Sequence, residues 1–161
     1  MTTAWVPLAT TTLSSSASSL TFGSISGSYR DLIVVANIDA SAFSDFRMRV
    51  NGDTGSNYPS VRMQGSGSLA ASATFNFTFF RFNGNSDMDT DFSFVSIIQV
   101  MDYSATDKHK TFLVRSNSSN GVDAHAGRWA NTNAVTSLEV FPSTGTFEIG
   151  STFSLWGSNR L

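Results

Sequence analysis

Glutamate and lysine are nearly absent from this 161-residue chain, which narrows the range of folds open to it. Ten of the twelve acidic residues are Asp, and eight of the ten basic residues are Arg. Glu and Lys are good helix formers, whereas the Asp, Ser, Gly and Asn that are frequent here favour turns. We therefore predict a sheet protein with many loops.

Short apolar segments separated by turn residues run along the whole chain. Residues 46–50 alternate strictly, which places Phe46, Met48 and Val50 inside and the two intervening arginines outside. Residues 32–38 are a continuous apolar run and are predicted to form a strand buried on both faces. Residues 92–100 form the longest apolar strand candidate, which we expect in the middle of a sheet.

The remaining apolar segments complete an all-β pattern. Further strands are expected at residues 20–22, 61–63, 74–82, 111–115, 135–141, 146–149 and 152–156. Within residues 74–82 the alternation slips between Phe79 and Phe80, as at a β-bulge, and residues 64–72 are predicted to be a mobile loop. About ten short strands with regular turn signals indicate an antiparallel β-sandwich, jelly-roll-like in topology.

The domain organisation is simple. Residues 20–161 are predicted to form a single β-sandwich domain, since no internal repeat or domain boundary is visible. Residues 1–19 contain a Ser/Thr-rich stretch, which is either a flexible N-terminal arm or an edge strand. The N-terminus lacks the pattern of a signal peptide.

Composition excludes several classes of function. The net charge is −2 and there is no basic stripe, which argues against direct nucleic-acid binding. The absence of Cys excludes disulfides, thiolate metal sites and cysteine nucleophiles. No apolar run approaches the roughly 18 residues of a membrane span. No membrane partner and no cofactor are expected.

Catalytic motifs are lacking. His109 and His125 are the only histidines, and Asp123 would point to the same face of a strand as His125. No Gly-x-Ser-x-Gly elbow is present. The two glutamates, Glu139 and Glu148, occupy outward strand positions instead of forming a catalytic pair. We predict that the protein is not an enzyme.

Two oxygen-rich loops are candidate ion sites, although no metal is expected. Asp87, Asp89 and Asp91 stand at alternate positions, and such loops can hold calcium. Phe92 stands where an EF-hand needs Gly, so a solvated loop that enters a strand is the alternative. The loop at residues 51–58 also offers oxygens, but its Asn and Asp side chains suit a self-hydrogen-bonded turn.

Six aromatic residues allow two interpretations. They are Trp5, Trp129 and Trp156, with Tyr29, Tyr58 and Tyr103. Exposed together, they would form a platform for stacking against a glycan. Aromatic residues at strand ends serve equally as core caps or interface anchors.

Several stretches, spread over nearly the whole chain, resemble one protein group. They are Phe22 to Ile25 with Tyr29 to Leu32, Val50 to Asp53 with Asn57 and Tyr58, Asp102 and Tyr103 with Lys110 and Thr111, Gly127 to Trp129, Val135 to Leu138, and the ending at residues 147–157. Together they resemble small virion structural proteins of tailed double-stranded DNA bacteriophages. That ending usually reads Leu-Tyr-Gly in the family, whereas this chain has Leu155, Trp156 and Gly157.

The resemblance implies a jelly-roll-like sandwich without catalysis, placed on the outer surface of the virion. The expected function is that of a capsid decoration, or cement, protein that binds the assembled head and stabilises it. The alternative is a tail or fibre component that binds a host-surface glycan. A compact domain without fibrous repeats favours decoration. The expected partners are the major capsid protein, other virion proteins, and copies of this chain in a trimer or dimer.

Contacts with those partners are predicted at aromatic residues and loops. The expected contact residues are Trp5, Asp53, Asn57, Tyr58 and Trp129. The loops at residues 51–58 and 83–91 are expected to take part.

Overall fold

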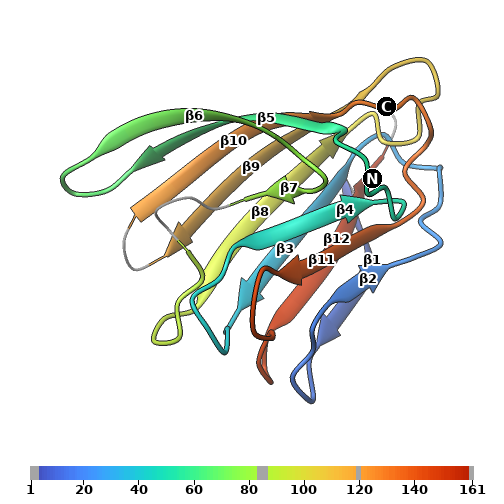
Figure 1. Cartoon of the computed structure of the whole chain (residues 1–161). Coiled ribbons are helices and arrows are strands. Elements are labelled where there is room, and N and C mark those ends of the chain that lie inside the picture. The colour runs from blue at the N-terminus through green and yellow to red at the C-terminus, as the bar shows by residue number, and fades with distance from the viewer. Residues whose placement is uncertain (1–3, 83–86, 119–120, 160–161) are drawn as a thin grey trace.

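The computed structural model describes residues 4–82, 87–118 and 121–159, and in these residues the chain forms two antiparallel sheets and no helix (Figure 1). The predicted all-β antiparallel sandwich is thereby confirmed, with twelve strands where about ten were expected from the turn spacing. The jelly-roll topology stays a prediction.

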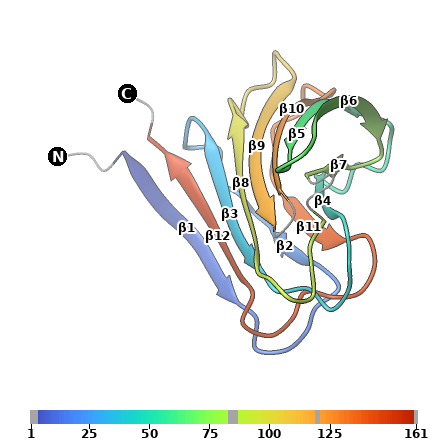
Figure 2. The ribbon, with the colours of Figure 1, turned by 90° about the vertical axis from the view of Figure 1, so that its left-hand side faces the viewer.

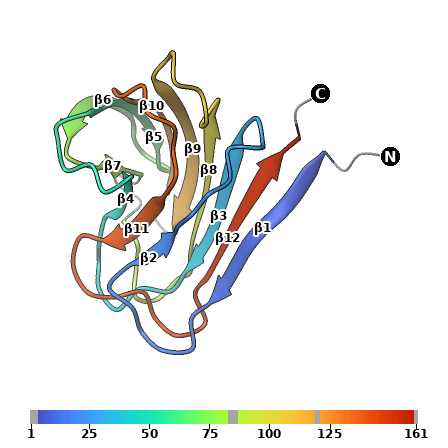
Figure 3. The ribbon, with the colours of Figure 1, turned by 90° about the vertical axis from the view of Figure 1, so that its right-hand side faces the viewer.

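The larger sheet has eight strands. In spatial order they are β1 (Trp5–Thr12), β12 (Thr152–Ser158), β3 (Leu32–Ile38), β8 (Phe94–Met101), β9 (Lys110–Ser118), β10 (Gly121–Trp129), β5 (Tyr58–Gly65) and β6 (Ala70–Phe77). Figures 2 and 3 show that this sheet is curved, so that its β5–β6 end bends over towards the smaller sheet while the β1–β12 end stands away from it.

The smaller sheet covers one face of the larger. Its strands, in spatial order, are β2 (Leu20–Phe22), β11 (Leu138–Pro142), β4 (Phe46–Val50) and β7 (Phe80–Arg81). Phe46, Met48 and Val50 of β4 are fully buried, as their alternation predicts. The ring of Phe46 packs at 5.7 Å from that of Phe94 on β8. Burial of apolar side chains between the sheets, these rings among them, stabilises the fold.

The N-terminal segment forms an edge of the large sheet. Of the two alternatives for residues 1–19, residues 5–12 adopt the edge strand, β1, which pairs with β12. The register shifts between Pro7 and Ala9. Proline and an irregular register both protect an edge strand from pairing with other chains. Residues 1–3 lie outside the described residues.

Three local predictions are wrong. The slip between Phe79 and Phe80 is no bulge, because there the chain leaves β6 and enters β7 in the other sheet. Residues 64–72 are not one loop, since β5 continues to Gly65 and β6 begins at Ala70, which leaves only residues 66–69 as a loop. Residues 146–149 make only isolated bridges, from Phe147, because the glycines at 145 and 150 have positive φ and interrupt the extended chain.

Candidate functional site

A network of hydrogen bonds centres on Asp53, in the loop between β4 and β5. Its carboxylate accepts hydrogen bonds from Trp129 Nε1 at 2.7 Å, Asn57 Nδ2 at 2.9 Å and the Gly55 amide at 2.8 Å. Its main-chain carbonyl accepts one from the Tyr58 hydroxyl at 2.8 Å. Burial alone would raise the pKa of Asp53, but the hydrogen bonds outweigh it and hold that pKa below its ordinary value.

Four of the five predicted contact residues therefore belong to one internal network, and two of them are buried. Tyr58 is fully buried and Trp129 is 1% exposed, and burial raises the pKa of Tyr58 to about 12. These two side chains hold the loop from inside and present no surface to a partner. Trp5 is 38% exposed on the edge strand β1. Its partner contact, like those of Asp53 and Asn57, stays a prediction.

The three Asp residues proposed as candidate ion ligands do not converge. Asp87 lies 3.7 Å from the guanidinium of Arg81. Asp89 is buried and accepts a hydrogen bond at 3.1 Å from the main-chain amide of Asp91, which is itself exposed. Within the described ranges, no group of three or more His, Cys, Asp or Glu side chains is placed to hold a metal ion. Residues 83–86 of the predicted loop lie outside those ranges.

The six aromatics considered for glycan stacking do not share one surface. Trp129, Tyr58 and Tyr103 are buried in the core. Trp156 and Tyr29 are half-buried, and Trp5 is the one exposed member of the set. A platform built from all six is therefore not formed.

Part of the inner face of the large sheet is polar. Asp123 and His125 of β10 point to the same face, as predicted, and both are buried. Neither ring nitrogen of His125 has a hydrogen-bond partner in the described part of the chain. Burial first, and then the charges of Arg62 and Arg81, lower the pKa of His125 to about 4. The imidazole is therefore neutral at pH 7.

The outer face of the large sheet is not covered by any described part of the chain. The prediction that residues 32–38 are buried on both faces is wrong. Leu32 and Val34 point inward and are fully buried, but Ile33 and Val35 are only half-buried and Asn37 is exposed. Residues of β8 repeat this pattern, with aliphatic side chains on both faces and a cover on only one.

Three cross-strand rows span this outer face. One row contains Ser72, Met63, Ala124, Arg115, Ile97, Val35, Ser154 and Thr10. The next contains Thr74, Val61, Ala126, Leu113, Gln99, Ile33, Trp156 and Pro7. The third contains Ala70, Gly65, Val122, Asn117, Val95, Asn37, Thr152 and Thr12. Arg115 is the only charged side chain in these rows, all of whose residues are described. Charged residues are mostly exposed in folded proteins, so a sheet face with one charge in three rows is unusual for a surface in water.

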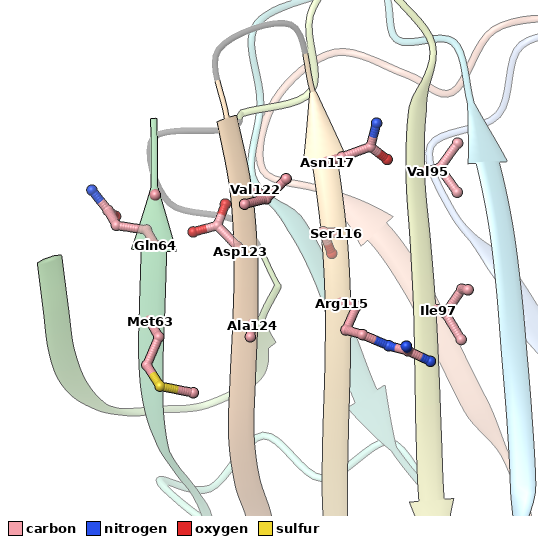
Figure 4. Close-up of a pocket in the computed structure, with 11 residues that line it drawn as sticks. Met63, Gln64, Val95, Ile97, Arg115, Ser116, Asn117, Val122, Asp123 and Ala124 are labelled. Atoms are coloured by element: carbon pink, nitrogen blue, oxygen red, sulfur yellow. The ribbon is translucent and has the colours of Figure 1, made fainter. Parts of the chain in front are cut away.

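A shallow hollow of about 670 Å³ lies in this face (Figure 4). Met63 of β5 and Ile97 of β8 stand on its two sides, with Ala124 of β10 between them. Met63 is 56% exposed, and Val122, at one end, is 60% exposed. The small residue Ala124 on β10, between the larger Met63 and Ile97, makes the depression, and its exposed surface is chiefly apolar.

The sequence analysis does not identify these residues as a site. Residues 121–129 are not among the expected strands, because Gly, Asp, Ala and His are weak strand formers, although Asp123 and His125 are placed on one face if that segment is extended. Pairing with β9 on one side and β5 on the other makes β10 a strand. The available signal was the continuous apolar run at residues 32–38. A strand that is apolar on both faces needs a cover on each face, and the described chain covers only the inner face of this strand.

Comparison with known proteins adds no relative, because no protein-family model and no curated protein sequence matches the chain. Among the described residues there is no helix long and apolar enough to cross a bilayer. A function for this protein is therefore inferred from its own geometry and from the resemblance in its sequence.

Proposed function

We propose that this protein is a structural component of a tailed-phage virion, a capsid decoration protein that binds the assembled head through the outer face of its eight-stranded sheet. The observation that carries the proposal is the outer face itself. Its three rows contain one charge, and its exposed aliphatic side chains include Met63, Leu113 and Val122.

The composition of the outer face supports docking against protein. Exposed apolar side chains gain free energy when a partner removes them from water, by roughly 25 cal/mol per Å². Hydroxyl and amide groups, such as those of Thr74 and Gln99, lose less on desolvation than charged groups do. Depletion of charge at the centre of a surface is characteristic of interface cores. Together these properties favour a contact surface over one that stays in water.

The buried polar groups support a role without catalysis. His125 is neutral, buried and without a hydrogen-bond partner among the described residues, so it has no group to which it could relay a proton. Asp53 is occupied by its internal hydrogen bonds. Neither group is arranged to work on a substrate.

The choice between head and tail rests on the resemblance and on the aromatic residues. Stacking against a glycan needs exposed rings, and the burial of Trp129, Tyr58 and Tyr103 removes half of the predicted platform. Decoration needs only a contact surface. A protein that binds the assembled head alone stabilises it by mass action, and several copies on one head add their effects.

The test is to add purified protein to phage particles that lack it and to locate it by cryo-electron microscopy. We expect ordered density at symmetric positions on the head. A Met63→Glu/Val122→Glu double variant should lose at least about tenfold in bound copies, because two carboxylates would be buried. Ile149→Glu is the matched control, since Ile149 is 64% exposed but lies outside the large sheet.

Two outcomes would overturn the proposal. Density on the tail alone would assign the protein to the tail or fibre. Equal binding by the double variant and the control would show that the outer face does not dock.

A further inference from the structure

Three adjoining hollows follow β10 on the outer face, and together they form a trough. Ala124 and Ala126 form its floor, Val61 and Met63 of β5 form one wall, and Leu113 of β9 stands on the other side. Neighbouring strands lie about 4.8 Å apart, so the two walls are separated at the main chain by about twice that distance. Seven residues of β10, from 122 to 128, are about 20 Å long. These dimensions suit one extended segment of about six residues.

Two charged side chains adjoin this trough, Arg115 beside its middle and Arg128 at its far end. Arg115 is the one that lies next to Met63 and Ile97. It lies opposite Ala124 on the neighbouring strand β9, and Figure 4 shows it extending towards β8 beside Ile97. It is exposed and forms no ion pair or hydrogen bond with the described residues. A partner that covered Met63 and Ile97 would cover Arg115 as well.

Covering Arg115 sets a condition on the partner's charge. Removing a guanidinium from water is costly unless an anion pairs with it. The three outer rows contain no carboxylate. Asp123 borders the same hollow, but it is buried on the inner face. The same face of a second copy therefore has no group to neutralise Arg115, so the anion must come from a different surface.

We propose that the trough binds an extended apolar segment of a partner protein, and that a carboxylate of this segment pairs with Arg115. The inference rests on the proposed docking role of the outer face and specifies the chemistry of the partner. Alternate aliphatic side chains of the segment would lie over Ala124 and Ala126. The carboxylate would meet the guanidinium in a bidentate pair, which fixes the register of the segment.

The test is selection from a random peptide library that is displayed on cells and not on phage particles. The purified full chain is the bait. We expect enrichment of peptides in which aliphatic residues alternate and one Asp or Glu recurs at a constant position. The Arg115→Glu variant should select Lys or Arg at that position instead. It should also bind the acidic peptides at least about tenfold more weakly, measured by isothermal titration calorimetry.

Two further variants control the experiment. Arg30→Glu changes an exposed arginine in the segment before β3, away from β10, and should keep the preference for acidic peptides. Ala124→Phe fills the floor of the trough and should abolish enrichment. Circular dichroism and thermal unfolding identify any variant that fails to fold. If Arg115→Glu fails to fold, Arg115→Leu replaces it and should lose the preference for acidic peptides.

The outcomes separate this inference from the proposed function. An absence of enrichment, or an acidic preference that survives in both Arg115→Glu and Arg115→Leu, overturns the inference. The particle-binding experiment is independent of that result. The Met63→Glu/Val122→Glu variant could lose binding to particles while Arg115→Glu shows no charge switch, that is, no change from acidic to basic peptides. That result would support docking through the outer face and overturn the binding of an acidic segment. A charge switch without binding to particles supports the inference and overturns the role in the virion.

Discussion

The two faces of the eight-stranded sheet are built from the same strands and differ in almost every physical property. Phe112 and Leu113 are consecutive residues of β9, yet Phe112 is 1% exposed in the core while Leu113 is 43% exposed. The inner face carries aromatic packing and also the polar residues Asp123 and His125. The outer face has one charge in three rows. An apolar residue in this sheet therefore does not by itself mark the core of the chain.

The largest expected effect is on the inner face. Phe112→Ala should lower the free energy of unfolding by about 3–5 kcal/mol, because it leaves a cavity in a close-packed core. The ring of Phe112 lies 4.3 Å from that of Phe80 on the opposite sheet, so contact between the sheets is lost as well. Urea denaturation followed by circular dichroism measures the free energy of unfolding of the variant and of the parent protein. A loss below about 1 kcal/mol would mean that the sheets are not packed as described.

A smaller effect concerns the charge of His125. Its pKa is lowered to about 4 in the folded protein, from 6.5 in the unfolded chain. Between these values the unfolded chain binds more protons, so stability is full above about pH 6.5 and falls as the pH drops towards 4, by up to about 1.4 kcal/mol per pH unit. His125→Gln should flatten this dependence in urea denaturation from pH 4.5 to 8.

The exposed His109 supplies the control for that experiment. His109→Gln should keep the slope of the parent protein. Identical slopes in the parent and in His125→Gln would show that His125 is solvated or paired in solution.

The smallest expected effect is on the outer face. Leu113→Thr should change the free energy of unfolding by at most about 0.5 kcal/mol, because the side chain is largely in water and Thr is a good strand former. The same denaturation experiment compares it directly with Phe112→Ala. A loss close to that of Phe112→Ala would mean that the outer face is covered within the isolated protein, which would remove the difference between the faces.

Local pattern predicts those elements whose burial is repeated regularly along the chain. The alternation at residues 46–50 predicts β4 and the buried positions of Phe46, Met48 and Val50. The same reasoning does not predict β10, because its Gly, Ala, Asp and His residues have weak strand propensity and its pairing with β9 and β5 makes the strand. It also misses the crossing at Phe79 and Phe80, where the chain passes from one sheet to the other.

The candidate site depends even more on pairing between distant segments. Met63, Ala124, Arg115 and Ile97 come from four strands and become neighbours only through the order and register of the sheet. Nothing in their local sequence indicates this order. Residue type alone predicts Trp129 as a contact residue. Its indole is instead used inside the protein, to hold Asp53.

Composition and local pattern are enough to specify an antiparallel sheet structure, because Glu and Lys are scarce, turn residues are frequent and apolar positions alternate as they do in strands. They also specify that residues 32–38 carry aliphatic side chains on both faces. Which of those faces is covered depends on how the two sheets pack against each other. A single small sheet of four strands covers one side, and the register of eight strands gathers the uncovered aliphatic residues around Arg115.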